Sequence, residues 1–259
     1  MTDRERNVQV FQDTLLQAKN KYDPNEVEIL LYDGTLDFAR TLALPPIHFV
    51  NGGTVSTGYK YAENEHVAIL NFADALTAGG LVEAGETTQE ENICRCSNLY
   101  PTLTREGCKK FYYDENAKHG GVYTDRIIYS RGVTVFKDDV TYKTIFPRVL
   151  DVITCPAPSC RMDKYRAGGV YENRIKQILF SAIDNGAETI VLGAWGCGAF
   201  GQNPHLVATA FANVLCEYGG HFKHIVFAIK PTPMYSDVDN AYVFKEVLTR
   251  LYTGGVINE

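Results

Sequence analysis

The sequence predicts one α/β domain in which helices cover both faces of a mixed, largely parallel central sheet. Three observations lead to this fold class. Apolar runs of strand length alternate with stretches of helical periodicity, the strands of the C-terminal half are apolar throughout, and no repeat or linker interrupts the 259 residues. Strands that are apolar on both faces need cover on both faces, which a three-layer α/β/α arrangement provides.

The first half of the chain contains two expected helices and several short strands. Apolar residues at helical spacing predict a helix over residues 3–21. A second helix is expected from Thr88 toward Tyr100, ended by Pro101. Runs rich in β-branched and aromatic residues predict strands at 27–32, 47–50, 67–72, 126–129, 133–136 and 149–154.

The second half repeats the alternation of helix and strand more regularly. One helix ends at Asn185-Gly186, and a strand at 189–192 follows it. After a glycine-rich loop, Asn203 caps a helix that Pro204 opens. A strand at 225–229 and a helix at 241–251 complete the expected fold. The helix that ends at Asn185-Gly186 has the apolar stripe Tyr171, Ile175, Ile178, Leu179, Ala182 and Ile183. The helix that Pro204 opens has the stripe Val207, Ala210, Phe211, Val214 and Leu215.

The charge of the chain limits what it can bind. Its formal net charge is −6, and no lysine/arginine cluster provides a basic nucleic-acid-binding face. A bound phosphate must then be held by backbone amides. The N-terminal stretch is charged and amphipathic, and no apolar run approaches membrane-spanning length. We therefore expect a cytoplasmic protein without a membrane partner.

The seven cysteines suggest reduced thiols rather than a disulfide framework. Cys94-x-Cys96 and Cys155-x4-Cys160 lack the paired C-x2-C spacing that is typical of zinc sites. Buried structural cysteines are the favoured interpretation, and neither a metal nor a cofactor is expected.

A glycine-rich loop follows the strand at 189–192. Glycines at 193, 196, 198 and 201 let the backbone approach a ligand closely and turn its amides toward it. The loop lies at the carboxyl end of a strand, where open α/β sheets bind ligands. Trp195 and Phe200 are suited to stacking on adenine or ribose. The alternative is a structural turn in which both aromatic rings plug the core.

Gly196-x-Gly198-x-x-Gly201 also matches the dinucleotide-binding fingerprint of oxidoreductases. That motif should open a helix directly, whereas the helix signal here waits until Asn203. The next strand should end in an acidic residue, but it ends in Ile229-Lys230. An NAD-linked dehydrogenase is therefore disfavoured.

Two adjacent glutamates, Glu90 and Glu91, stand at the expected start of the helix near Thr88. Glycoside cleavage needs an acid for the leaving oxygen and a carboxylate for the water or the oxocarbenium ion. One glutamate can serve both proton transfers in sequence. A purely structural interpretation also fits, because Thr88-x-x-Glu91 matches a capping box and acids in a first helical turn offset the macrodipole.

Together these stretches resemble the poly(ADP-ribose) glycohydrolase family, bacterial type, of the macrodomain superfamily. The family signature is a Gly-Gly-Gly run, a spacer and Gln-Glu-Glu; here Ala78-Gly79-Gly80 precedes Gln89-Glu90-Glu91 by eight residues. A second hallmark loop matches Gly193 to Gly201. The resemblance implies a macrodomain-like fold over 1–259, with an N-terminal extension at 1–45 and a core at 46–259.

The resemblance also implies an activity and its residues. The reaction is hydrolysis of the ribose–ribose O-glycosidic bond of poly(ADP-ribose), without a metal, and Glu91 is the acid/base. Glu90 would hold the ribose hydroxyls. The ligand is ADP-ribose or its polymer, including ADP-ribosylated protein. The implied substrate contacts are Asn71 at adenine, Asp74 at ribose, Gly79, Gly80, Gly196 and Gly198 at the diphosphate, Phe200 on the nucleoside, and Gln89, Gly193, Trp195, Cys197 and Ala199.

Two residues depart from the family pattern. Ala78 replaces the first glycine of the run, and Asp74 replaces an amide by a carboxylate, which loses donors and adds charge beside a diphosphate. These changes keep two alternatives open: a hydrolase of mono-ADP-ribose on a protein, nucleic acid or related nucleotide, and a reader module that binds ADP-ribose without turnover. The paired glutamates argue against a reader, which needs no acid.

Overall fold

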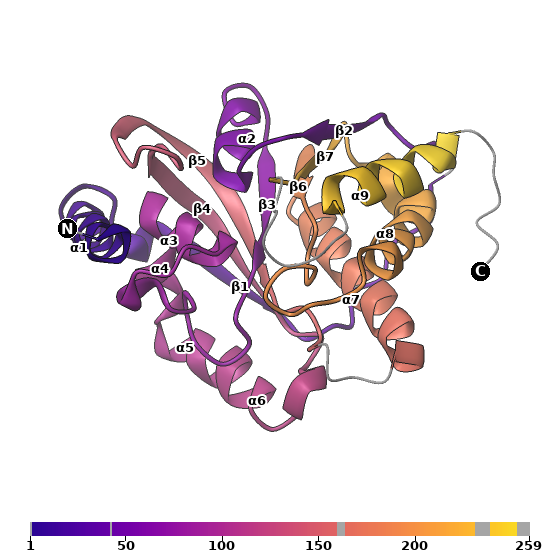
Figure 1. The fold of residues 1–259 in the computed structure, drawn as a ribbon, viewed down its shortest axis with the longest axis horizontal. Helices are drawn as coiled ribbons and strands as arrows, with labels where there is room; N and C mark the ends of the chain where they lie inside the picture. The colour runs from indigo at the N-terminus through magenta and orange to yellow at the C-terminus, as the bar shows by residue number, and fades with distance from the viewer. Residues whose placement is uncertain (1, 42, 160–163, 231–238, 253–259) are drawn as a thin grey trace.

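The computed structural model describes residues 2–41, 43–159, 164–230 and 239–252, with backbone alone at 164–168 and 252. Seven strands form one sheet in the order β1-β4-β5-β3-β6-β7-β2 (Figure 1). Their bounds are β1 Glu28–Tyr32, β2 Ile47–Val50, β3 Val67–Phe72, β4 Ile127–Lys137, β5 Thr144–Cys155, β6 Thr189–Leu192 and β7 His224–Ala228.

The sheet is mixed and largely parallel, as the apolar strands predicted. Strands β5, β3, β6, β7 and β2 run parallel to one another, whereas β4 pairs antiparallel with both β1 and β5. The register places Ala68 of β3 opposite Asp151 of β5 and Val67 of β3 opposite Thr189 of β6. The carboxyl ends of β3 and β6 therefore lie side by side, and the loops that follow them share one edge.

Helices cover both faces of the sheet, and two separate cores result. Alternate residues of each strand point to opposite faces: Ala68 and Leu70 pack with one core, and Val67 and Ile69 with the other. The first core includes helices α7 Lys164–Asp184, α8 Pro204–Tyr218 and α9 Asn240–Thr249. The second includes α1 Asp3–Lys21, α2 Thr54–Tyr61, α3 Gln89–Cys96 and α4 Leu99–Leu103. Figure 1 shows the sheet between these two groups.

Helix α1 begins with a capping box between Thr2 and Glu5 and covers α3. Its fully buried positions are Asn7, Phe11, Thr14 and Ala18, so polar side chains share the inward face with apolar ones. Asn7 donates to the carbonyl of Gly85, and Thr14 donates to the carbonyl of Arg95. These bonds satisfy the buried polar groups and fix the extension against the residues around the candidate site.

One predicted helix is two helices, and Pro101 does not end the first of them. Helix α3 ends at Cys96, because Ser97 is extended and bridges to Val135 of β4. Pro101 lies in the first turn of α4, where a backbone amide has no partner within the helix. The predicted strands 126–129 and 133–136 are also one strand, β4, with a register shift between Ser130 and Val133.

Helix α7 ends at its predicted stop and begins before the predicted apolar stripe, and α8 and α9 begin and end close to their predicted positions. Asn203 accepts a hydrogen bond from the amide of His205, and Pro204 opens α8. The sequence patterns missed α2 and the segment 106–122. That segment holds α5 Glu106–Cys108, a π-helical turn at Lys109–Tyr113, α6 Asp114–Asn116 and a 3-10 turn at Gly120–Val122. Further 3-10 turns lie at Pro24–Glu26, Val82–Ala84, Gly219–His221 and Arg250–Tyr252.

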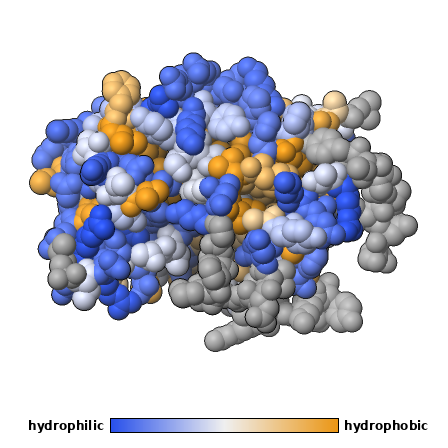
Figure 2. Space-filling model, turned by 45° about the horizontal axis from the view of Figure 1, so that its top comes forward, coloured by the Kyte–Doolittle hydropathy of each residue, from blue (hydrophilic) through white to orange (hydrophobic). Residues whose placement is uncertain are grey.

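The surface of the described chain is mostly hydrophilic on the face that Figure 2 shows, where hydrophobic residues form groups among hydrophilic ones. The most exposed large apolar side chain is Phe146, in strand β5, at 78%. No helix among the described residues is both long enough and apolar enough to cross a membrane.

Candidate functional site

The loop after β3 is shaped by Asp74. Its Oδ1 accepts hydrogen bonds from the amides of Leu76 (2.7 Å) and Thr77 (2.8 Å), which closes a turn at the end of the strand. The chain then reaches Gly79 and Gly80, both in the left-handed region at φ +69° and +59°. Both amides reach the same oxygen, which an asparagine would also provide, so this turn does not explain the departure from the family pattern.

Gln89 ties the start of α3 to the end of β3. Its Oε1 accepts from the amide of Phe72 (2.8 Å), and its Nε2 donates to the carbonyl of Leu70 (2.7 Å) and to Thr54 Oγ1 (3.1 Å). The side-chain amide thus continues the hydrogen bonding of the strand. The Gln89 side chain thus anchors the helix that carries both glutamates, and its contact with the substrate stays a prediction.

Glu90 lies beneath the loop with 2% of its surface exposed. Its Oε2 accepts from the amide of Asp74 (2.7 Å) and its Oε1 from Asn71 Nδ2 (3.2 Å). Burial raises the pKa of Glu90 to about 8, and the charges of Glu91 and Asp74 add to the shift, while the two hydrogen bonds oppose it. Burial outweighs the donors, so Glu90 holds its proton at neutral pH.

Asn71 is fully buried at the end of β3. Its side chain donates to Glu90 and, at 3.3 Å, to Thr154 Oγ1 of the neighbouring strand. The enclosed side chain holds Glu90 in place. The contact of Asn71 with adenine stays a prediction.

Glu91 is held from two sides. Its Oε1 accepts from the backbone amide of Leu81 (3.0 Å), and its Oε2 accepts from the hydroxyl of Thr88. Among the described residues, the N-cap Thr88 makes no side-chain capping bond, so the capping box suggested by Thr88-x-x-Glu91 does not form. The Glu91 carboxylate faces the Gly80–Leu81 backbone, and 4% of the residue is exposed.

The second loop follows β6 and runs from Gly193 to the N-cap Asn203. Gly193 is closely packed: a Cβ at that position would lie 2.8 Å from the carbonyl oxygen of Ala228 and from the ring of Phe72. Gly196 and Gly201 take positive φ angles of +81° and +63°. Glycine is required at these positions because a side chain would collide or be strained.

The loop residues differ in exposure. Trp195 is fully buried, donates from Nε1 to the carbonyl of Cys155 (3.2 Å) and packs edge-on against Tyr171. Its ring is a core residue, which corrects our expectation that it stacks on a ligand. Cys197 is buried as well. Gly198 and Ala199 are exposed, and Phe200 is half-buried against the core, so only these three of the predicted loop contacts reach the surface with their own atoms.

The structure thus brings the two predicted stretches together. They follow the adjacent strands β3 and β6, and α3 begins beside the first of them. The sequence patterns missed two contributors, the Thr88 hydroxyl and the Leu81 amide. The only sequence signal for the first was the apparent capping box.

Comparison with known proteins connects this geometry to a family. The family model for the catalytic domain of microbial-type PARG, where PARG is poly(ADP-ribose) glycohydrolase, matches residues 3–138, which include both glutamates and the loop before them. This chain belongs to the microbial-type PARG family. The comparison with curated proteins gave no match.

Solved PARG structures resemble this PARG-family chain over most of its length. The poly(ADP-ribose) glycohydrolase of Thermomonospora curvata bound to the inhibitor ADP-HPD is 27% identical, with a TM-score of 0.80, over 94% of this chain and 99% of that one. The enzyme of Deinococcus radiodurans in complex with ADP-ribose is 30% identical, with a TM-score of 0.74, over 82% of this chain and 87% of that one. These matches extend beyond residue 138 and confirm the predicted macrodomain-like fold.

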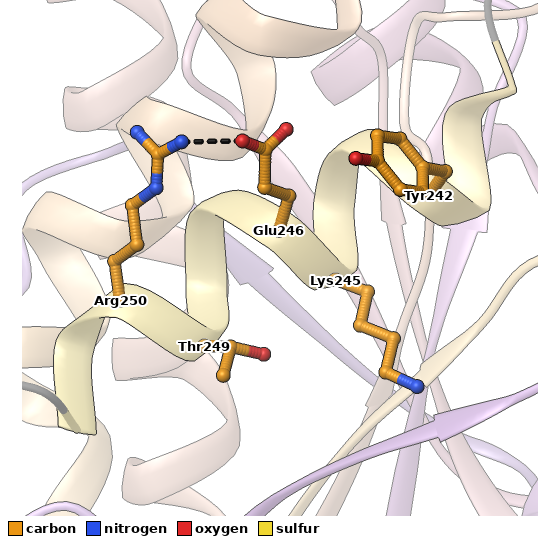
Figure 3. Close-up of a pocket in the computed structure, with 5 residues that line it drawn as sticks. All are labelled: Tyr242, Lys245, Glu246, Thr249 and Arg250. Atoms are coloured by element: carbon orange, nitrogen blue, oxygen red, sulfur yellow. Dashed lines mark hydrogen bonds and ion pairs between the residues drawn. The ribbon is translucent and has the colours of Figure 1, made fainter.

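A second surface feature of this microbial-type PARG lies on α9. Figure 3 shows a shallow depression along α9, lined by Tyr242, Lys245, Glu246, Thr249 and Arg250, where Glu246 pairs with Arg250. Within the described ranges, no group of three or more histidine, cysteine or acidic residues is placed to hold a metal. Cys160, part of one cysteine pair considered for zinc, lies outside those ranges. Five described cysteines are buried, and Cys216 is exposed.

Proposed function

We propose that this chain hydrolyses the ribose–ribose O-glycosidic bond of poly(ADP-ribose) and releases ADP-ribose, with Glu91 as the acid/base. The observation that carries the proposal is the pair of buried carboxylates at the start of α3, beside a glycine loop, in a chain of the PARG family. Buried carboxylates of unequal environment are the arrangement that acid-assisted glycoside cleavage uses.

The reaction proceeds in two proton transfers. Protonated Glu91 gives its proton to the leaving ribose oxygen as the bond to the anomeric carbon breaks, and the electron pair of that bond stays on the oxygen. Water then adds to the oxocarbenium carbon, and the Glu91 carboxylate takes the proton that the water loses. Glu90, which lies next to Glu91, forms hydrogen bonds with the ribose hydroxyls beside the broken bond.

Backbone amides hold the diphosphate. With a net charge of −6 the chain has no general attraction for a polyanion. The backbone of Gly79 and Gly80 lies against the start of α3, where the helix dipole favours negative charge, and the exposed Gly198 and Ala199 supply amides from the second loop. Phe200 is half-buried and stacks on the nucleoside. Asp74 borders the ribose through its backbone turn.

The ligand is ADP-ribose at the end of its polymer, including polymer attached to protein. The D. radiodurans enzyme was crystallised with ADP-ribose, which supports this ligand. Residues 1–45 and 46–259 act as one unit in this proposal. In support, β1 pairs with β4, and Thr14 of α1 binds the carbonyl of Arg95 at the end of α3.

The direct test is release of free ADP-ribose from poly(ADP-ribose) by purified wild type and Glu91→Gln. Glutamine keeps an acceptor for the Leu81 amide, so the fold is preserved while the acid is lost. We expect a loss of about 10²- to 10⁴-fold in kcat with unchanged ADP-ribose affinity. Full activity of the variant contradicts the role of Glu91, and ADP-ribose binding by a wild type that releases nothing contradicts the glycohydrolase.

A further inference from the structure

We propose that Thr88 is a positioning residue for Glu91: its hydroxyl fixes the plane of the Glu91 carboxylate against the reacting ribose. This inference rests on the proposed function and adds a residue to it. Thr88 has the sequence position of a helix N-cap, and its usual role there would be to accept an amide hydrogen bond from the first turn of α3. Its hydroxyl donates to Glu91 Oε2 instead.

The two hydrogen bonds that hold the Glu91 carboxylate differ in origin. The bond from Leu81 to Oε1 comes from the backbone, and any residue at position 81 provides it. The bond from Thr88 to Oε2 depends on a side-chain hydroxyl. With one oxygen held, the carboxylate still rotates about that contact; with both held, its plane is set. Of the two hydrogen bonds, the one from Thr88 is therefore the one that depends on the identity of the residue.

The surroundings of Glu91 make this hold necessary. Gly80, which faces Glu91 Oε1, has no side chain to pack against the carboxylate. Among the described contacts, the neighbouring Glu90 bonds Asn71 and the Asp74 amide rather than Glu91. A displacement of about 1 Å in a catalytic group costs rate by roughly a hundredfold, and a single hydroxyl at the right point prevents that displacement.

Thr88 is suited to a test because it is exposed, so its substitution leaves the core intact. Thr88→Val removes the hydroxyl and keeps the shape, and Thr88→Ser restores a hydroxyl. The matched control is Thr87→Val, because the neighbouring Thr87 is also exposed and makes no hydrogen bond with its side chain among the described residues. A merely structural effect of replacing a hydroxyl by a methyl group before the helix would appear in both valine variants.

The experiment measures kcat and KM for ADP-ribose release, ADP-ribose affinity by calorimetry, and crystal structures of the full chain. Thr88→Val is expected to lower kcat by roughly tenfold to a hundredfold with KM and affinity unchanged. Thr88→Ser and Thr87→Val are expected to stay near wild type. In crystals of Thr88→Val, the Glu91 carboxylate is expected to leave the orientation that it has in wild type.

Two results overturn the inference: equal kcat in the Thr88→Val and Thr87→Val variants, or an unmoved Glu91 carboxylate in the Thr88→Val crystals. A fall in kcat that Thr88→Ser does not restore also counts against it, because the hydroxyl would then not be the cause. If wild type releases no ADP-ribose, the proposed function fails, and the orientation of Glu91 in the two crystal structures still decides the inference.

Discussion

The Gly80 backbone lies against the Glu91 carboxylate: a Cβ built on Gly80 would be 2.5 Å from Glu91 Oε1 and 3.3 Å from Glu90 Oε2. No real Cβ atom sits so close to an oxygen, so even a methyl group at position 80 displaces the carboxylates. Gly80 also has a φ of +59°, which costs an alanine about 1–2 kcal/mol. The glycine is thus needed both for the backbone and for the site.

We expect Gly80→Ala to lose much more activity than its loss of thermal stability explains. The added methyl group would push the Glu91 carboxylate away from its place beside the reacting ribose. The matched control is Gly132→Ala, since Gly132 has φ +87° and a Cβ there meets nothing within 4 Å. Both variants should lose similar thermal stability, and only Gly80→Ala should lose kcat by about a hundredfold. Equal activity of the two variants would show that the approach of Gly80 to Glu91 is irrelevant to turnover.

The raised pKa of Glu90 predicts a pH-dependent stability. The folded-state pKa of about 8 lies above the ordinary 4.5, so between these values the native state keeps a proton that the unfolded chain has lost. The stability from this group is fully present below pH 4.5 and is lost as pH rises through 8. Glutamine fits at this position, because Asn71 can turn its amide and accept from the new donor.

Glu90→Gln should therefore gain stability over wild type as pH rises from 5 to 8.5, by roughly 2–4 kcal/mol. Urea unfolding of both proteins across this range measures the difference. Parallel curves for the two proteins would mean that Glu90 titrates near its ordinary pKa in the native state.

Substitutions of the two aromatic residues of the glycine-rich loop should have different effects, one on ligand binding and the other on stability. Phe200 is half-buried and Trp195 fully buried. Phe200→Ala is expected to weaken ADP-ribose binding by about 1–3 kcal/mol through lost stacking, with little change in Tm. Trp195→Phe loses the bond to the Cys155 carbonyl and should cost about 1–3 kcal/mol of stability. Calorimetry and thermal melts distinguish them, and a Phe200→Ala variant that binds normally would identify its ring as a core plug.

Gln89 should matter for stability because its amide bonds the strand backbone. Gln89→Met leaves the Phe72 amide and the Leu70 carbonyl without their partner and is expected to cost about 2–4 kcal/mol. Gln17→Met on the exposed side of α1, where the side chain bonds Asp13, serves as the control and should cost less than about 0.5 kcal/mol. Chemical denaturation measures both, and similar losses would count against the anchoring role.

Local patterns predicted much of this fold. The apolar strand at 189–192, the Asn203-Pro204 helix start and the stops after α7 and α8 all depend on neighbours in the sequence, and the structure confirms them. Pro101 was misread because a proline in a first helical turn and a proline after a helix look alike without knowledge of the bridge from Ser97 to Val135.

The sequence by itself determined the fold class, the two loops and the paired glutamates, because strand and helix periodicity and glycine content are written in adjacent residues. Only the tertiary structure decided what each side chain faces. Trp195 turned inward, Asn71 and Gln89 were drawn into holding α3, and Thr88 reached Glu91 rather than its own helix. These outcomes depend on which strands lie side by side, and that contact between distant segments is what local periodicity does not encode.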